Sequence, residues 1–195
     1  IDSVERREQR ADSRAVARIL TPRAIAVVGA SDRRGSLGKV MWDHVARSAT
    51  VPIHAVNPRL AAAGDMLDGH PCVASVADLP DDVSLAIIAI AVRNLADTID
   101  QCIAKRMRGA VIVTNIDAPP IEHVDIDLNA LVARARRNGL RIIGPSSMGI
   151  TSFSTRGRLQ ASIVDVDLPA GNVAISLQGG SLGISMLRRA RELDL

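Results

Sequence analysis

Aromatic side chains are nearly absent from this 195-residue chain, which has one Trp, one Phe and no Tyr. Proteins that bind single-stranded nucleic acid stack the bases on aromatic side chains, and this chain has too few for that mode of binding. Hydrophobic residues nevertheless make up 47% of the sequence. We therefore expect a sizeable core of Ala, Val, Ile and Leu, in one large domain or in one domain and part of another.

Cysteines and long apolar runs are also scarce. Cys72 and Cys102 are the only cysteines, and two thiols in a chain of this length do not form a disulfide framework, which favours a reducing, cytoplasmic location. The sequence has no apolar run of about 18 residues, so we expect no membrane span. It also lacks paired histidines or cysteines at the spacing of metal ligands, and we predict no metal site.

The charged residues are balanced in sign and scattered along the chain. The net charge is +3, and Lys39 and Lys105 are the only lysines among 24 basic residues. Most arginines are interleaved with acidic residues, whereas a surface that binds nucleic acid gathers its cations together. The sequence therefore predicts no nucleic-acid partner.

Residues 1–20 have the pattern of a highly charged amphipathic helix. A thin apolar stripe that includes Ala15 and Ile19 runs between Arg and Glu residues. We interpret this segment as a linker helix packed on a neighbour, with a solvated helical tail as the alternative. The first residue is not Met and the last helical pattern has no capping Gly or Asn, so we expect the sequence to be part of a longer polypeptide.

Between residues 21 and 150, apolar runs of strand length alternate with helical patterns. The predicted strands are 24–28, 53–56, 85–90, 110–113 and 141–143, and the predicted helices are 36–46, 94–105 and 128–137. Continuous apolar runs are typical of parallel strands that are buried on both faces. The alternation predicts a doubly wound, Rossmann-like α/β domain with right-handed crossovers.

The last part of the sequence has a different pattern. Residues 151–170 are rich in Ser, Thr and Gly, and we interpret them as a connection. A predicted strand at 172–177, a glycine turn and a helix from residue 182 then follow. This β-loop-α unit, residues 171–195, predicts either the truncated start of a second, flavodoxin-like α/β domain or an addition to the first sheet.

The turn after the first predicted strand is rich in glycine. Gly29, Gly35 and Gly38 allow the backbone to approach a ligand closely, and the helix that follows offers unpaired N–H groups at its start. Lys39 adds a positive charge, and Arg33 and Arg34 lie on the loop. This combination suits a diphosphate, although a turn that only packs the helix on the strand is the alternative.

The usual nucleotide fingerprints are missing from this turn. The spacing is not G-x-G-x-x-G, and the second strand ends at Asn57-Pro58 instead of the acidic residue that holds the ribose of NAD. Gly38-Lys39 is followed by Val40, so no Walker A motif is present. The sequence favours a phosphate-bearing ligand other than NAD, and an NAD(P)-dependent oxidoreductase is the less favoured alternative.

Several segments together resemble a known family. Residues 22–38 match its opening strand and phosphate loop, and Val56-Asn57-Pro58-Arg59 is similar to its V-N-P-K strand end. Residues 71–80, 85–90, 109–113 and 139–150 follow in the same order. The family is the CoA-binding domain of NDP-forming acyl-CoA synthetases, which is related to the α subunit of succinyl-CoA synthetase. The resemblance covers about residues 21–195, and it implies a CoA site at the carboxyl ends of the strands.

The resemblance also implies a role for individual residues. The implied CoA contacts come from a phosphate loop (Gly29, Ser31, Gly35, Gly38, Lys39), an adenosine end (Asn57, Pro58, Arg59), a pantetheine path (Ala91, Val92, Arg93, Thr114, Asn115) and Ser146 near the thiol.

The family's catalytic machinery is not visible in this sequence. None of His44, His54, His70 and His123 matches the catalytic histidine of the family, and Leu177-Gln178-Gly179-Gly180 replaces its S-Q-S-G motif. The resemblance therefore implies the CoA- or acyl-CoA-binding portion of a ligase, inactive alone, with its acyl-phosphate mechanism completed elsewhere. ATP or ADP would bind only with those missing segments, on further domains or on a β-type ATP-grasp partner.

A second interpretation rests on the same resemblance. An Arg- and Glu-rich helix ahead of such a domain is similar to the linker in proteins that fuse a GNAT acetyltransferase to an acyl-CoA-synthetase-like region. The missing serines would suit a non-catalytic module that senses acyl-CoA and regulates the tethered acetyltransferase.

Overall fold

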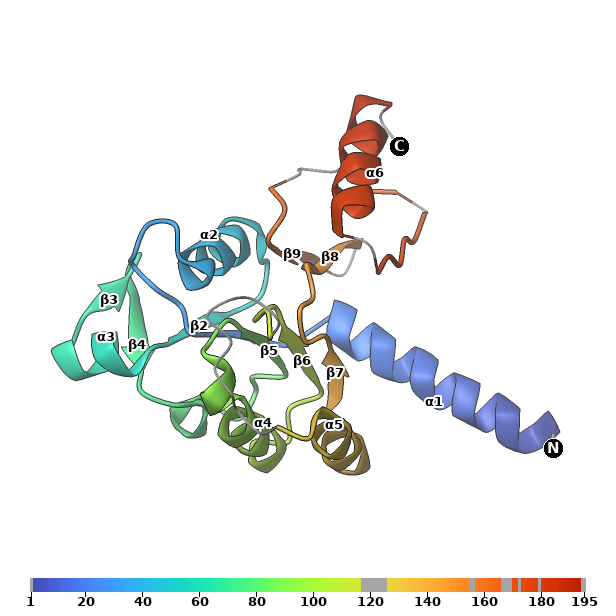
Figure 1. Ribbon diagram of the computed structural model, residues 1–195, viewed down its shortest axis with the longest axis horizontal. Helices are drawn as coiled ribbons and strands as arrows, with labels where there is room; N and C mark the ends of the chain where they lie inside the picture. Colours follow the sequence, from blue (N-terminus) through green and yellow to red (C-terminus); the bar gives the residue numbers. More distant parts are fainter. Residues whose placement is uncertain are drawn as a thin grey trace.

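The computed structural model describes residues 2–116, 126–154, 157–165, 170–171, 173–178 and 180–193. Its main feature is a seven-stranded sheet with helices on both faces (Figure 1). The strands of this sheet are β1 (Ile25–Val28), β2 (Ile53–Val56), β3 (Met66–Leu67), β4 (His70–Val73), β5 (Leu85–Ile88), β6 (Gly109–Ile112) and β7 (Arg141–Ile143). The helices are α1 (Asp2–Leu20), α2 (Leu37–Ser48), α3 (Pro58–Ala63), α4 (Leu95–Ala104), α5 (Leu128–Arg137) and α6 (Gly180–Glu192), with 3-10 turns η1 (Val76–Asp78) and η2 (Val92–Asn94).

The strand order is β3-β4-β2-β1-β5-β6-β7. β1 pairs in parallel with both β2 and β5, and in the described part of this sheet only β3 runs antiparallel to its neighbour. The chain therefore winds outward from β1 in both directions, and the predicted doubly wound, mostly parallel sheet is confirmed. In such sheets the order reverses at a crevice beside the first strand, and ligands bind at the carboxyl ends of the strands there.

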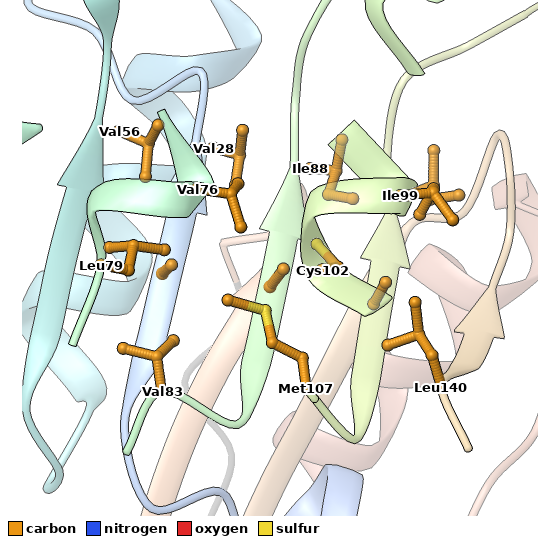
Figure 2. Close-up of a cluster of buried hydrophobic side chains, with 14 of the residues drawn as sticks. Val28, Val56, Val76, Leu79, Val83, Ile88, Ile99, Cys102, Met107 and Leu140 are labelled. Atoms are coloured by element: carbon orange, nitrogen blue, oxygen red, sulfur yellow. The ribbon is translucent and has the colours of Figure 1, made fainter. Parts of the chain in front are cut away.

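The core lies on both faces of the sheet because successive strand residues are apolar. Val28 and Ile88 lie on the face of the sheet that η1 and α4 cover, in a cluster that also contains Val76, Ile99 and Cys102 (Figure 2). Their strand neighbours pack on the opposite face, where Trp42 of α2 is fully buried. This two-sided burial is the physical reason for the continuous apolar runs in the sequence.

The connection predicted at residues 151–170 contains strands that the sequence analysis did not predict. β8 (Gly149–Ser154) and β9 (Gly157–Ser162) form an antiparallel hairpin that packs on α2. The backbone N–H of Gln160 donates to Ser48 Oγ at 2.8 Å, and Leu159 and Ala161 are buried in the core. The apolar residues alternate with polar ones here, which is the signal of a strand with one buried face.

The predicted strand at 172–177 is wrong for the described residues. Residues 173–177 belong to neither sheet, and Val173 is 78% exposed. A strand needs a partner for its backbone hydrogen bonds, and none of the described strands pairs with this segment. The following helix is present as α6, and a second domain that would supply such a partner remains a prediction.

The predicted N-terminal helix is confirmed as α1, which extends away from the sheet in Figure 1. The last turn of α1 packs on the sheet at β6. Ile19 is buried there, and its side chain occupies the space where a Cβ on Gly109 would lie. Arg141 also donates to Asp12 at 2.6 Å. The role of α1 as a linker stays a prediction.

Two kinds of feature are absent from the described residues. Within these ranges no helix has the length and apolar character needed to cross a membrane. The same part of the chain contains no group of three or more His, Cys, Asp or Glu residues that could hold a metal ion.

Candidate ligand-binding site

A cavity of about 770 Å³ opens where β1, β2, β5 and β6 end. It lies at the crevice beside β1, where doubly wound sheets bind their ligands, and its volume is typical of small-molecule sites. Its lining residues are Gly29, Ser31, Asp32, Arg33, Ser36, Leu37, Gly38, Asn57, Arg59, Ala89, Ile90, Thr114 and Asn115.

Gly38 lets the start of α2 pack directly on the end of β1, and Gly29 lets the end of β1 pack closely on the chain after β5. A Cβ on Gly38 would collide with the carbonyl oxygen of Gly29, and a Cβ on Gly29 would lie 2.9 Å from Ile90 Cγ2. Gly29 also has a φ of +88°, in the region that favours glycine. The close packing brings the first turn of α2 to the edge of the cavity. Gly35 is needed only for the backbone conformation of the turn, because its φ is +76° and a Cβ there would meet no neighbour.

The start of α2 presents unpaired N–H groups to the cavity. The Ser36 side chain caps the helix by accepting from the N–H of Lys39 at 3.2 Å, and the carbonyl of Ser36 accepts from Lys39 and Val40. Leu37 and Gly38 come first in the helix, so their N–H groups have no intrahelical acceptor. Both residues line the cavity, and a helix start of this kind attracts anions.

Asn57 ties the glycine-rich loop to α3. Its Oδ1 caps α3 by accepting from the N–H groups of Arg59 at 2.9 Å and Leu60 at 3.1 Å. Its Nδ2 donates to the carbonyl of Ala30 at 2.7 Å. Because one side chain joins both segments, Asn57 fixes the width of the cavity between them, and most of its hydrogen-bonding capacity is used for this.

Thr114 braces the opposite side of the cavity. Its hydroxyl donates to the carbonyl of Ile90 at 2.7 Å and accepts from the N–H of Ile90 at 3.1 Å, and the residue is buried. These bonds hold the chain after β5 against the chain after β6. The neighbouring Asn115 accepts from the Ser146 hydroxyl at 3.3 Å.

Three charged side chains surround the cavity. Arg33 comes from the loop after β1 and Arg59 from α3, while Asp32 of the same loop contributes a carboxylate. Asp32 and Arg59 form an ion pair that joins the loop to α3. The cationic side chains and the helix start favour an anionic ligand, and the carboxylate opposes it.

The structure brings together half of the fourteen residues implied by the resemblance. Those lining the cavity are Gly29, Ser31, Gly38, Asn57, Arg59, Thr114 and Asn115. Those outside its lining are Gly35, Lys39, Pro58, Ala91, Val92, Arg93 and Ser146. The Lys39 ammonium pairs with Asp43 one turn further along α2, while Ser146 is at the rim through its bond to Asn115. The roles of all these residues as ligand contacts stay predictions, and the pairing with Asp43 counts against that of Lys39.

Arg33, expected from the sequence to lie on the phosphate loop, lines the cavity, but five other lining residues were not predicted: Asp32, Ser36, Leu37, Ala89 and Ile90. Ala89 and Ile90 follow β5 directly, so the rule that ligands bind at strand ends could have found them. Ser36 was visible as the residue before a helix, which is the usual place of a capping serine. No local signal pairs Asp32 with Arg59, because they are 27 positions apart in the chain.

The described histidines lie outside the lining of this cavity. His44 is buried between α2 and the β8–β9 hairpin, with its Nδ1 2.6 Å from the carbonyl of Ser162. Burial lowers the pKa of His54 below its usual value, and nearby His70 lowers it further while Asp82 opposes the shift. His123 lies outside the described residues.

The residues around the cavity fit coenzyme A chemically. Free N–H groups at the α2 start and the cations of Arg33 and Arg59 suit phosphate groups. Leu37, Ala89 and Ile90 give the same cavity an apolar wall, which suits the uncharged arm of such a ligand.

Comparisons with known proteins agree with this chemistry. The sequence matches the family described as CoA binding domain over residues 23–152. The α subunit of an ADP-forming acetate–CoA ligase II from Pyrococcus furiosus is 31% identical over 174 residues, which are 89% of this chain and 36% of that subunit.

Two solved structures share the fold. PH0766 from Pyrococcus horikoshii superposes with a TM-score of 0.79 at 31% identity, over 92% of this chain and 40% of that protein. The dinucleotide forming acetyl-coenzyme A synthetase 1 of Ca. Korarchaeum cryptofilum, in complex with phosphate and ADP, gives 0.76 at 29% identity, over 91% and 37%. The chain spans between about a quarter and two fifths of the length of such relatives.

Proposed function

The chain belongs to the CoA binding domain family, and from this premise we propose that it binds coenzyme A or acyl-coenzyme A as part of an NDP-forming acyl-CoA synthetase. The observation that carries the proposal is the start of α2, held on β1 by Gly38, with its free N–H groups in a cavity that also contains Arg33 and Arg59. The similarity to ADP-forming acetate–CoA ligases supports the ligase class.

Each part of the cavity has a task in this proposal. The N–H groups of Leu37 and Gly38 hold the diphosphate, and the two arginines neutralise its charge. Ala89 and Ile90 form the wall along which the pantetheine arm lies. The bound coenzyme supplies a thiol that accepts acyl groups, while Asn57 and Thr114 keep the surrounding loops at a fixed separation.

The remaining steps of a ligase need more than this chain. We propose that phosphoryl transfer, and any ATP or ADP site, belong to segments outside residues 1–195 or to an ATP-grasp partner, because the chain spans only about a quarter of the ligase it matches in Archaeoglobus fulgidus. The chain alone would then bind coenzyme without forming acyl-CoA. A cytoplasmic location stays a prediction from the cysteine content.

One sequence observation favours the acyl-CoA sensor as a second function. Leu177 and Gly179 stand where the resembling family has serines. Loss of those hydroxyls would impair phosphoryl transfer but would leave coenzyme binding, which suits a sensor. Both functions use the same cavity. They differ in whether the full-length protein forms acyl-CoA from acid, ATP and coenzyme A, which a coupled assay measures.

The oxidoreductase alternative has less support. The residue at the end of β2 is Asn57, and its amide is used to cap α3 and to hold Ala30. The acid that would hold the ribose of NAD is missing from this position.

Calorimetric titration of the purified chain with coenzyme A, acetyl-coenzyme A and NADH tests the proposed function. We expect binding of both coenzyme A forms and no heat of binding with NADH. Binding of NADH without binding of coenzyme A would overturn the proposal and favour the oxidoreductase.

A further inference from the structure

Two links join the β1–α2 loop to α3 at the cavity, and they differ in kind. The first is the neutral hydrogen bond from Asn57 to the carbonyl of Ala30, which is partly buried. The second is the ion pair between Asp32 and Arg59, whose side chains are 52% and 63% exposed. The neutral link fixes the loop, whereas a charged, exposed link can open without loss of the fold.

The carboxylate of Asp32 places a negative charge in a loop whose other groups attract anions. The start of α2, Arg33 and Arg59 all favour a ligand with negative charge. A carboxylate accepts hydrogen bonds and cannot donate them, so Asp32 adds nothing to phosphate binding and repels the phosphate. Its partner in the structure is the guanidinium of Arg59, which binds carboxylate and phosphate with the same planar donors.

We propose that Asp32 and Arg59 form a latch: without ligand Asp32 occupies Arg59, and a ligand phosphate displaces it. Asp32 is thus a competitor built into the site. When the ligand leaves, Asp32 takes Arg59 back, so the latch lowers the affinity for the phosphorylated ligand and speeds its dissociation. This inference rests on the proposed function, since it concerns the same cavity.

The charge-neutral substitution Asp32→Asn tests the latch. We expect coenzyme A to bind about twofold to fivefold more tightly to this variant, mainly through slower dissociation, because Arg59 is released from its competitor. Calorimetry gives the affinity, and stopped-flow displacement gives the dissociation rate. Melting temperatures of all variants show that the fold is retained.

Two further variants separate the latch from a general charge effect. In an Arg59→Gln background the Asp32→Asn substitution should tighten binding clearly less than in the parent chain, because only the repulsion between Asp32 and the phosphate is removed and no partner remains to be released. Asp43→Asn is the matched control: it removes the same charge from α2, but Asp43 pairs with Lys39 and does not line the cavity. We expect no change from it.

The results distinguish the latch from the proposed function. If the parent chain binds coenzyme A and Asp32→Asn leaves the affinity unchanged or weaker, the latch is wrong and the proposed function stands. Equal tightening by Asp32→Asn with and without Arg59, or tightening by Asp43→Asn, also overturns the latch, since Asp32 would act by repulsion alone. If the parent chain binds no coenzyme A, the proposed function itself fails.

Discussion

Substitution of Gly38 by alanine puts the seating of α2 on β1 to a direct test. The added Cβ would meet the carbonyl oxygen of Gly29 well inside the 3.0 Å that real Cβ atoms keep. The carbonyl oxygen and carbonyl carbon of Gly29 are both backbone atoms, so they cannot move aside as a flexible side chain would. Helix α2 would therefore have to shift by roughly 1 Å or more. Overpacking of this kind costs about 1–3 kcal/mol, and we expect a loss near 3 kcal/mol in the free energy of unfolding.

The same shift should weaken ligand binding. It moves the N–H groups of Leu37 and Gly38 away from the place where the diphosphate would lie, and each lost hydrogen bond to a charged group costs about 1.5–3 kcal/mol. We therefore expect at least a tenfold loss of affinity for coenzyme A. Urea denaturation followed by the fluorescence of the buried Trp42 measures the stability, and calorimetry measures the affinity.

Two other glycines provide the controls. A Cβ on Gly35 meets open space, but its φ of +76° is unfavourable for alanine, so Gly35→Ala should cost about 1 kcal/mol from the backbone alone. Gly171 has open space and no such φ, and Gly171→Ala should have no measurable effect. If Gly38→Ala is as stable as Gly171→Ala and binds coenzyme A equally well, the close seating of α2 has no role in stability or binding.

Four further predictions follow from the described contacts. Asn57→Ala should lower the free energy of unfolding by about 1–2 kcal/mol in urea denaturation, because the α3 cap and the bond to Ala30 are both lost; an unchanged midpoint would contradict the structural role. Lys39→Ala should change the coenzyme A affinity less than twofold by calorimetry, since its ammonium pairs with Asp43 outside the cavity lining; a larger loss would return it to the site. Burial raises the pKa of Cys102 to about 12, so mass spectrometry should find it unmodified by iodoacetamide in the folded chain at pH 8 and labelled once the chain unfolds; rapid labelling of the folded chain would refute this burial. Burial also lowers the pKa of His54, so the unfolded chain takes up a proton that the folded chain resists, and stability should fall as the pH drops below about 6.5; a His54→Gln variant with the same pH dependence would assign the effect elsewhere.

The sheet was predictable because its signal lies within each strand. The apolar runs of β1, β5 and β6 are buried on both faces, and continuous runs of this kind follow from parallel strands covered by helices. The β8–β9 hairpin was missed although Leu159 and Ala161 alternate with polar residues, because the surrounding Ser, Thr and Gly residues suggested a loop. The strand at 172–177 was predicted from its apolar run alone, and it is not formed by the described residues. An apolar run cannot show whether a partner strand exists.

The candidate site was predictable where strand ends determine position. Gly29, Asn57 and Thr114 follow β1, β2 and β6, so the fold alone brings them to one edge. The direction of a long side chain is decided by its partners, as for Lys39, whose pairing with Asp43 was visible as a spacing of four residues on a helix. The pairing of Asp32 with Arg59 depends on the crossover from β1 to α3 and has no local signature.

A crystal structure of the chain grown with coenzyme A would test the central claim most directly. We expect the diphosphate to lie within hydrogen-bond distance of the N–H groups of Leu37 and Gly38, with Arg59 turned from Asp32 toward a phosphate. Coenzyme A bound at another surface, with the start of α2 open to solvent, would contradict it.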